Sequence, residues 1–176
     1  MNDLLLLAML LGGPTHGYAL KKRASWLTGQ KNLHNNLVYP LLARFRKAGW
    51  ITQKSGKGQR GQVRELYSLT PRGKAELLRR LSEFSEKDAA TDNAFRLRIG
   101  LFFALDATAR DHILNAREAY LAQREEKFTN LAHNIELGEW GSEVTQFLRR
   151  QVRAERNWIA NLKRKAGSVS PRTQKE

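Results

Sequence analysis

The chain has 176 residues and carries 31 Lys and Arg against 17 Asp and Glu, so its formal net charge is +14. The hydrophobic content of 41% predicts a packed core, and the absence of cysteine excludes zinc fingers, disulfide scaffolds and thiol catalysis. None of the four histidines (His16, His34, His112 and His133) stands at HxH or HxxxH spacing, so we expect no metal site and no cofactor.

The positive charge is concentrated in the first half of the chain. Residues 1–90 carry 16 basic and 6 acidic side chains (net +10), whereas residues 91–176 carry 15 and 11 (net +4). Residues 4–64 contain eleven Lys and Arg and no Asp or Glu. A nearby carboxylate would cancel part of the free energy of counterion release on phosphate binding. The bias therefore favours contact with nucleic acid over an ordinary solvated face, on which acids are interspersed.

An apolar run opens the chain. Residues 4–11 are expected to form a helix that Asn2 or Asp3 caps and that the Gly-Gly-Pro sequence at 12–14 ends. Eight apolar residues are too few for a membrane span, and no basic segment precedes them as it would in a signal peptide. Together with the lack of cysteine, this predicts a cytoplasmic, nucleoid-associated protein.

Two further helices are expected next. Thr15 is placed to cap a helix over residues 16–28, with Tyr18 on its buried face. A third helix over residues 34–48 has apolar residues at i, i+4 spacing on one face and polar and basic residues on the other. Gly49 ends it.

A β-hairpin and a fourth helix complete the first half. Residues 50–54 and 63–69 alternate in polarity and flank a basic, glycine-rich turn. Thr70 followed by Pro71 is a strong helix start, and this helix is expected to reach about residue 87. Three helices, a hairpin and a helix in this order predict a winged helix-turn-helix, so the expected fold class is mainly α with a small β-hairpin wing.

The second half is predicted to be helical throughout. Helices are expected over residues 92–105, 107–137 and 142–166, the first capped by its Asp. In the second of these an apolar residue recurs every seven positions. Arg117 and Arg124 occupy the intermediate seam positions, so the pattern is not a clean coiled coil.

These elements divide the chain into two predicted domains and a tail: a winged helix-turn-helix domain over residues 1–90, a helical dimerisation domain over 91–166 and a disordered tail over 167–176. Within one copy of the chain, the apolar faces of the two long helices have little surface to pack against. We therefore expect a two-fold dimer. A monomer with its helical hairpin folded back on the winged domain is the alternative. The expected interface residues are Phe95, Leu101, Phe102, Leu121, Phe128, Leu148, Val152, Trp158 and Ile159.

Candidate DNA-binding residues lie on the second and third helices and on the hairpin. An asparagine amide can pair with adenine, a phenol can bond a base edge or a phosphate, and basic side chains suit phosphates or the minor groove. Capping by an asparagine and half-burial of the tyrosine are the structural alternatives. The candidates are Lys21, Lys22, Asn35, Asn36, Tyr39, Arg44, Arg46, Lys47, Lys57, Arg60 and Arg64.

Two tryptophans are candidates for the wall of an effector pocket. Flat aromatic rings such as those of Trp140 and Trp158 stack on planar ligands, so the expected effector is a small aromatic molecule. Aromatic residues at helical spacing also occur in plain interface cores, and this alternative stays open.

Several ordered segments resemble a known family. GPTHGYAL at residues 13–20, LVYPLL at 37–42 and YSLTPRG at 67–73 resemble the start, the recognition helix and the wing end of the PadR family of bacterial transcriptional regulators. FRLRIGLFF at residues 95–103 resembles the start of the long C-terminal helical domain of one branch. The resemblance implies a homodimeric repressor that binds an inverted-repeat operator and leaves it when a small molecule binds at or near the dimer interface.

The sequence departs from the family where DNA would be met. Asn35 and Asn36 stand where the family's recognition helix usually begins with a small hydroxyl residue or glycine, and residues 60–65 replace a tighter basic run. The operator sequence of other members is therefore not carried over. A constitutive or architectural DNA-binding protein without a small ligand is the main alternative. We do not expect an enzyme, because no phosphate loop and no Ser–His–acid arrangement is present.

Overall fold

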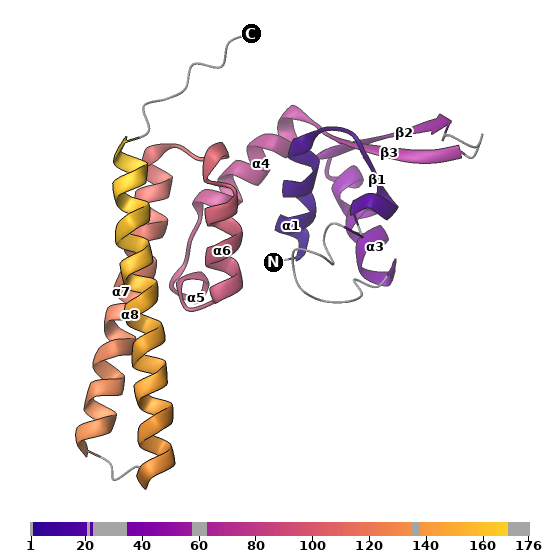
Figure 1. Ribbon diagram of the computed structural model, residues 1–176. Coiled ribbons are helices and arrows are strands. Elements are labelled where there is room, and N and C mark those ends of the chain that lie inside the picture. The colour runs from indigo at the N-terminus through magenta and orange to yellow at the C-terminus, as the bar shows by residue number, and fades with distance from the viewer. Residues whose placement is uncertain (1, 21, 23–34, 58–62, 135–137, 169–176) are drawn as a thin grey trace. The chain divides into compact units, whose positions relative to one another are not determined.

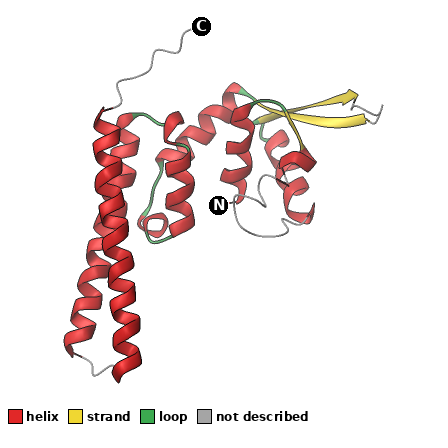
Figure 2. Ribbon diagram, in the orientation of Figure 1, coloured by secondary structure: helices red, strands yellow, loops and turns green. Residues whose placement is uncertain are grey.

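The computed structural model describes residues 2–20, 22, 35–57, 63–134 and 138–168. Most of these residues are helical, and one small antiparallel sheet accompanies the helices (Figures 1 and 2). This confirms the expected fold class. None of the described helices combines enough length with enough apolar character for a membrane crossing.

The chain divides into two compact units. The first comprises Met1–Glu83 and the second Phe84–Glu176. We expected the boundary after residue 90, so the short segment between the two positions belongs here to the second unit. The functional domain boundaries stay a prediction, and the expected tail lies almost wholly outside the described residues.

The first helix packs its apolar side chains into the core of the first unit. α1 (Asn2–Met9) passes into the 3-10 helix η1 (Leu10–Gly12), and the side chains of residues 4–10 are all buried. Gly13 then adopts a φ of 107°, a conformation that favours glycine, and ends the run. α1 packs against α4 (Pro71–Ser82).

A short strand follows where we expected a helix cap. β1 (Thr15–His16) pairs antiparallel with β3 (Val63–Leu69). The prediction that Thr15 caps a helix over residues 16–28 is therefore wrong, because its backbone pairs with a strand that lies far along the chain. The described helical residues begin at Gly17.

Tyr18 lies on the outside of this second helix. Its side chain is 74% exposed, whereas Leu20 is fully buried. The expected burial of Tyr18 is wrong because residues two positions apart point to different faces of a helix, and Leu20 occupies the buried one. Residues 23–34, the remainder of the expected helix and the segment after it, fall outside the described residues.

Helix α3 (Asn35–Lys47) is amphipathic, as predicted. Its buried face consists of Val38, Leu42 and Phe45, each of which is at most 1% exposed. Gly49 adopts a φ of 73° and carries the chain from the helix into the hairpin. On the opposite face of α3, the side chains of Tyr39, Arg44, Arg46 and Lys47 are exposed to solvent.

The hairpin consists of β2 (Ile51–Lys57) and β3. The two strands pair antiparallel along their whole length, and β1 joins the other edge of β3. β2 extends past the expected residues 50–54 because the backbone continues to pair where we expected the start of the glycine-rich turn. The tip, residues 58–62, falls outside the part of the chain that the structure describes.

Helix α4 begins at the predicted cap. The Gly73 N–H donates a hydrogen bond to Thr70 Oγ1 (2.9 Å), and the same hydroxyl donates to the Gly49 carbonyl oxygen (2.8 Å). The Thr70 N–H donates to the Trp50 carbonyl oxygen (2.9 Å). Only glycine fits at position 73, since a Cβ there would lie 1.9 Å from that carbonyl oxygen. The cap therefore fastens α4 to the first residues of the wing.

A separate short helix, α5 (Glu86–Ala89), replaces the expected end of α4. The Ser85 hydroxyl accepts a hydrogen bond from the Asp88 N–H (3.2 Å), and the Asp88 carboxylate accepts one from the Ser85 N–H (3.3 Å). This reciprocal capping starts a new helix. The prediction that α4 continues to about residue 87 is wrong for this reason.

The remaining helices form the bulk of the second unit. α6 (Asp92–Gly100) leads through the 3-10 helix η2 (Phe102–Ala104) to the long helices α7 (Ala107–Asn134) and α8 (Gly138–Ser168). The two long helices pack side by side as a hairpin (Figure 1).

Two helix ends differ from expectation. The helix expected over residues 92–105 stops at Gly100, where the Leu101 N–H bonds the Arg98 carbonyl (2.9 Å) and tightens the chain into a 3-10 turn. The last helix begins at Gly138 rather than at residue 142, because this glycine takes up the turn with a φ of 63° and leaves the following residues helical.

Arg117 joins four helices of the second unit. Its fully buried guanidinium donates to the Ala89 carbonyl of α5 (2.6 Å), to Asp92 Oδ1 of α6 (2.5 Å) and to both Glu155 oxygens of α8 (2.9 Å each). Asp92 therefore does not cap α6, because its carboxylate is directed to Arg117. The guanidinium also lies 5.4 Å from the Phe95 ring centroid.

We expect Arg117→Met to lower the free energy of unfolding by about 1.5–3 kcal/mol, because it removes the charged hydrogen bonds to Asp92, Glu155 and the Ala89 carbonyl. Urea unfolding followed by circular dichroism measures this. Arg150→Met, at an exposed arginine of α8, is the matched control and should change the free energy little. Equal stability of the two variants would show that the Arg117 network contributes nothing beyond a surface ion pair.

Candidate nucleic-acid interface

The outer face of α3 presents the predicted DNA-binding side chains. Tyr39 is 48% exposed, and the side chains of Arg44, Arg46 and Lys47 are also exposed. Their exposure follows from the burial of the apolar face of α3, since the two faces lie on opposite sides of one helix. The first unit thus exposes three cations and a phenol from a single helix.

An acidic residue of α1 forms an ion pair with Arg44 of α3. The Asp3 carboxylate pairs with Arg80 (3.0 Å) and, more loosely, with Arg44 (3.4 Å). Burial by itself raises the pKa of Asp3, but the N–H of Leu4 and the charge of Arg80 outweigh burial and hold the pKa below its usual value. Asp3 therefore stays ionised and offsets part of the charge of Arg44.

Arg46 connects the recognition helix with the hairpin. Its guanidinium donates to Gln53 Oε1 of β2 at 2.7 Å. The bond crosses from α3 to the wing, so the two elements that would meet DNA hold each other in position. Burial raises the pKa of the neighbouring Tyr67 on β3, which keeps that phenol protonated.

Tyr39 combines packing with exposure. A Cβ added at Gly17 would lie 3.2 Å from Tyr39 Cε1 and 3.5 Å from Tyr67 Cε2, so both rings lie against this glycine. One edge of the Tyr39 ring is thereby packed, while about half of the side chain remains open to solvent. This geometry is compatible with both roles considered for Tyr39, half-burial and contact with DNA.

Tyr18 is a candidate that the sequence analysis missed. It follows Gly17 directly and is the most exposed of the large aromatic residues described in the first unit. This exposure is not evident from the sequence, because an aromatic residue at the start of a helix is usually part of the core. We add Tyr18 to the candidate interface.

The other predicted contacts are only partly described. Lys22 is exposed. Asn35 and Asn36 form the first turn of α3, but their side chains are not described. Lys57 and Arg64 are placed opposite Val63 and Gly56 in the hairpin by their backbones alone, and Lys21 and Arg60 lie outside the described residues.

The expected dimer residues fall into two groups. Four are buried within the single chain and belong to its own core: Phe95, Leu121, Val152 and Ile159. The rest keep some exposure, namely Leu101, Phe102, Phe128, Leu148 and Trp158. A separate apolar face of α8 is open to solvent and consists of Trp140 (79% exposed), Val144 (58%) and Phe147 (53%).

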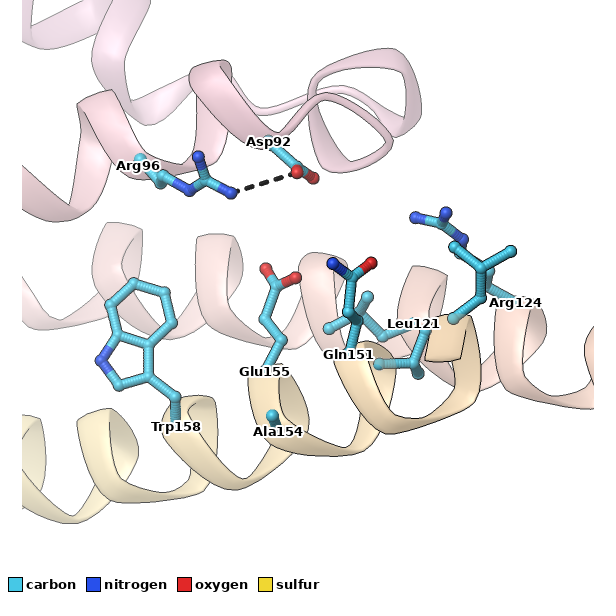
Figure 3. Close-up of a pocket in the computed structure, with 10 residues that line it drawn as sticks. Asp92, Arg96, Leu121, Arg124, Gln151, Ala154, Glu155 and Trp158 are labelled. Carbon is cyan, nitrogen blue, oxygen red and sulfur yellow. Dashed lines mark hydrogen bonds and ion pairs between the residues drawn. The ribbon is translucent and has the colours of Figure 1, made fainter. Parts of the chain in front are cut away.

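A cavity of about 370 Å³ lies in the second unit (Figure 3). Trp158 and Glu155 rise from α8 on one side of it, and Asp92 and Arg96 of α6 lie on the other. Of the two tryptophans predicted to wall a pocket, Trp158 lines this cavity. Trp140 does not line it, because Trp140 belongs to the exposed face of α8.

The first unit is similar to a known family of proteins. A protein family described as "Transcriptional regulator PadR-like family" matches residues 6–79, from within α1 through α3 and the hairpin into α4. The chain belongs to this PadR-like family. It is therefore a DNA-binding transcriptional regulator rather than an enzyme. A search of curated proteins found no match.

Solved structures of PadR-like and other regulators are similar to the chain. TA0346 from Thermoplasma acidophilum is 33% identical over 43% of this chain and 72% of its own, with a TM-score of 0.41. Bacillus subtilis PadR in complex with operator DNA is 15% identical over 93% and 98% of the two chains, with a TM-score of 0.46. The same protein in complex with p-coumaric acid is 16% identical over 94% and 98%, with a TM-score of 0.42.

We expect Gly17→Ala to weaken DNA binding roughly tenfold, because the new methyl group displaces the Tyr39 ring by a few tenths of an ångström. The salt dependence of binding should not change, since no charge is altered. Gly12→Ala is the control, because a Cβ at Gly12 has no atom within 4 Å. Fluorescence anisotropy with a bound DNA fragment measures both, and identical affinities would remove Tyr39 from the DNA contact.

Proposed function

We propose that this PadR-like regulator is a homodimeric repressor of the cytoplasm, bound at the nucleoid. It binds an inverted-repeat operator and leaves it when a small organic molecule binds the helical unit. The exposed basic face of α3, in a stretch of chain without carboxylates between residues 4 and 64, is the observation that carries the proposal.

Each half of the operator is read by α3 in the major groove. Asn35, Asn36 and Tyr39 occupy the front of the helix, where base edges come within reach. Phosphates are held by cations on three elements, and the wing tip adds contacts in or beside the minor groove. These cations are Lys21, Lys22, Arg44, Arg46, Lys47, Lys57, Arg60 and Arg64.

The dimer is supported by the open apolar face of α8. Trp140, Val144 and Phe147 recur at helical spacing and leave large apolar side chains in water. A second copy packed on this face, with Leu148 and Trp158 beside it, would remove them from solvent. Two-fold symmetry would then present two recognition helices to successive turns of DNA.

Small-molecule release is supported by the cavity of the second unit, which has the size of a small-molecule site. Its lining residues come from helices that directly follow the DNA-binding unit in the chain. A molecule bound there can favour one arrangement of those helices over another, and only such a difference in affinity can release DNA.

We expect Lys57→Ala combined with Arg60→Ala to reduce the salt dependence of DNA binding. The slope of log K against log salt should fall by about one to two units, because each phosphate contact contributes roughly 0.9. Lys87→Ala with Arg150→Ala removes two exposed cations of the second unit as a control. A slope that stays at the wild-type value would remove the wing from the phosphate interface.

We expect Val144→Ser combined with Phe147→Ser to raise the dimer dissociation constant about hundredfold or more. Burial of each large apolar side chain contributes about 1.5–3 kcal/mol, and the two-fold axis doubles the loss. Gln146→Ser, at an exposed polar position of the same helix, is the control. Sedimentation equilibrium decides the matter, and a wild-type dimer in the double variant would place the interface elsewhere.

Selection of bound fragments from a random DNA pool at about 150 mM salt tests the proposal as a whole. We expect an enriched inverted repeat, which requires both sequence readout and a symmetric dimer. Salt-sensitive binding without enrichment would overturn operator recognition and favour a constitutive, architectural DNA-binding protein.

A further inference from the structure

One carboxylate joins three elements of the first unit. Oδ2 of Asp3 on α1 lies 3.0 Å from an Arg80 nitrogen of α4 and 3.4 Å from an Arg44 nitrogen of the recognition helix α3. The other oxygen, Oδ1, accepts a hydrogen bond from the Leu4 N–H (2.9 Å). Two guanidinium groups therefore share a single carboxylate oxygen. Because like charges repel, a closer contact with one arginine weakens the contact with the other.

The two arginines are held to different degrees. Arg80 also donates to Glu76 Oε1 (2.6 Å), its guanidinium lies 4.6 Å from the Trp50 ring centroid, and its side chain is 28% exposed. The Arg44 side chain is 58% exposed, and within the described residues Asp3 is the one carboxylate that forms an ion pair with it. Arg80 is thus fixed by three neighbours, whereas Arg44 can turn from Asp3 toward solvent.

Asp3 supplies a negative charge that the neighbouring sequence lacks. Residues 4–64 contain no Asp or Glu, so a carboxylate reaches α3 only from outside this stretch. Asp3 stands immediately before it, and the fold brings its side chain to Arg44, 41 positions further along the chain. Elsewhere on α3, no described carboxylate forms an ion pair with Arg46 or Lys47. Arg44 is therefore the cation of α3 whose charge is offset within the protein.

We propose that Asp3 is a positioning residue for DNA binding, which holds Arg44 in the free protein and yields it to a DNA phosphate in the complex. The inference rests on the proposed function, in which Arg44 is a phosphate contact. Since the phosphate has to displace a carboxylate, Asp3 lowers the affinity for DNA of any sequence. Arg80 competes for the same carboxylate oxygen, so it loosens the hold on Arg44 and raises that affinity.

Arg80 connects this contact with the second unit through the chain. It lies in the last turn of α4, which ends at Ser82, and α5 follows after only three residues. A shift of that last turn would withdraw Arg80 from Asp3, and the carboxylate would then bind Arg44 more closely. The affinity for DNA falls as a result. A structural change in the second unit can in this way reach α3 through α4 alone.

Asp3→Asn tests the contact on a mixed-sequence DNA duplex, because phosphate contacts carry no sequence information. We expect this variant to bind about two- to fivefold more tightly at about 50 mM salt, the size that an exposed ion pair implies. Asparagine keeps an oxygen for the Leu4 N–H, so the start of α1 is retained. Fluorescence anisotropy measures the affinity.

Glu86→Gln is the control for this variant. It makes the same change of net charge at an exposed residue of α5 and should bind the duplex like the wild type. An equal gain in Glu86→Gln and Asp3→Asn, or no gain in Asp3→Asn, would overturn the inference.

Arg44→Gln decides whether Asp3 acts through this arginine. Alone, it should lower the slope of log K against log salt by about one unit, since a phosphate contact contributes roughly 0.9. Asp3→Asn added to Arg44→Gln should change the affinity no further. A gain that persists without Arg44 would show that Asp3 acts through the general charge of the unit, and would overturn the inference.

Arg80→Gln tests the competition for Asp3. We expect about two- to fivefold weaker binding in the otherwise wild-type protein and no change in the Asp3→Asn background. Arg79→Gln, at the adjacent arginine that pairs with Glu76 and Glu83, removes the same charge and should bind like the wild type. A loss in Arg80→Gln that is equal with and without Asp3 would overturn the competition. Circular dichroism confirms that each variant is folded.

The outcomes separate this inference from the proposed function. A lower salt slope in Arg44→Gln with no effect of Asp3→Asn would support Arg44 as a phosphate contact and overturn the inference alone. An unchanged slope in Arg44→Gln would overturn both the inference and the proposed role of Arg44. A mixed-sequence duplex requires neither an operator nor an effector, so these results do not depend on the repressor proposal.

Discussion

The helical unit depends on one buried cation. A guanidinium removed from water costs several kcal/mol unless its donors find acceptors, and Arg117 finds them on α5, α6 and α8. If any of these helices moved away, a buried charge would lose a partner. The arrangement of the helices is therefore set by the satisfaction of one charge as much as by the apolar seam between α7 and α8.

In the DNA-binding unit, too, acidic residues form ion pairs with arginines. Asp3 pairs with Arg80, which also lies 4.6 Å from the Trp50 ring centroid. Glu76 is hydrogen-bonded by Arg79 and Arg80, and these bonds lower its pKa to about 2. Asp3 also pairs with Arg44 at 3.4 Å, whereas among the described residues no carboxylate forms an ion pair with Arg46 or Lys47 of α3, which remain for phosphate.

Acidic residues are also unevenly distributed between the two halves of the chain. Residues 91–176 contain 11 of the 17 acidic residues, and several of them pair with basic residues across the α7–α8 hairpin. Glu125 binds Arg153 and Arg156, which lower its pKa, and Glu118 binds Lys163. These ion pairs stabilise the packing of the two long helices against each other.

The sequence by itself determined the winged helix-turn-helix order, the Thr70 cap, the amphipathic α3 and the basic bias, because caps, periodicity and composition are local signals. Only the tertiary structure decided that Thr15 belongs to a strand, that Tyr18 is exposed, and that Arg117 rather than an apolar residue ties the helices together. The tertiary structure alone also decided the position of the cavity beside Trp158. Each depends on partners far apart in the chain, and neither hydrogen-bond satisfaction nor burial can be read from neighbouring residues alone.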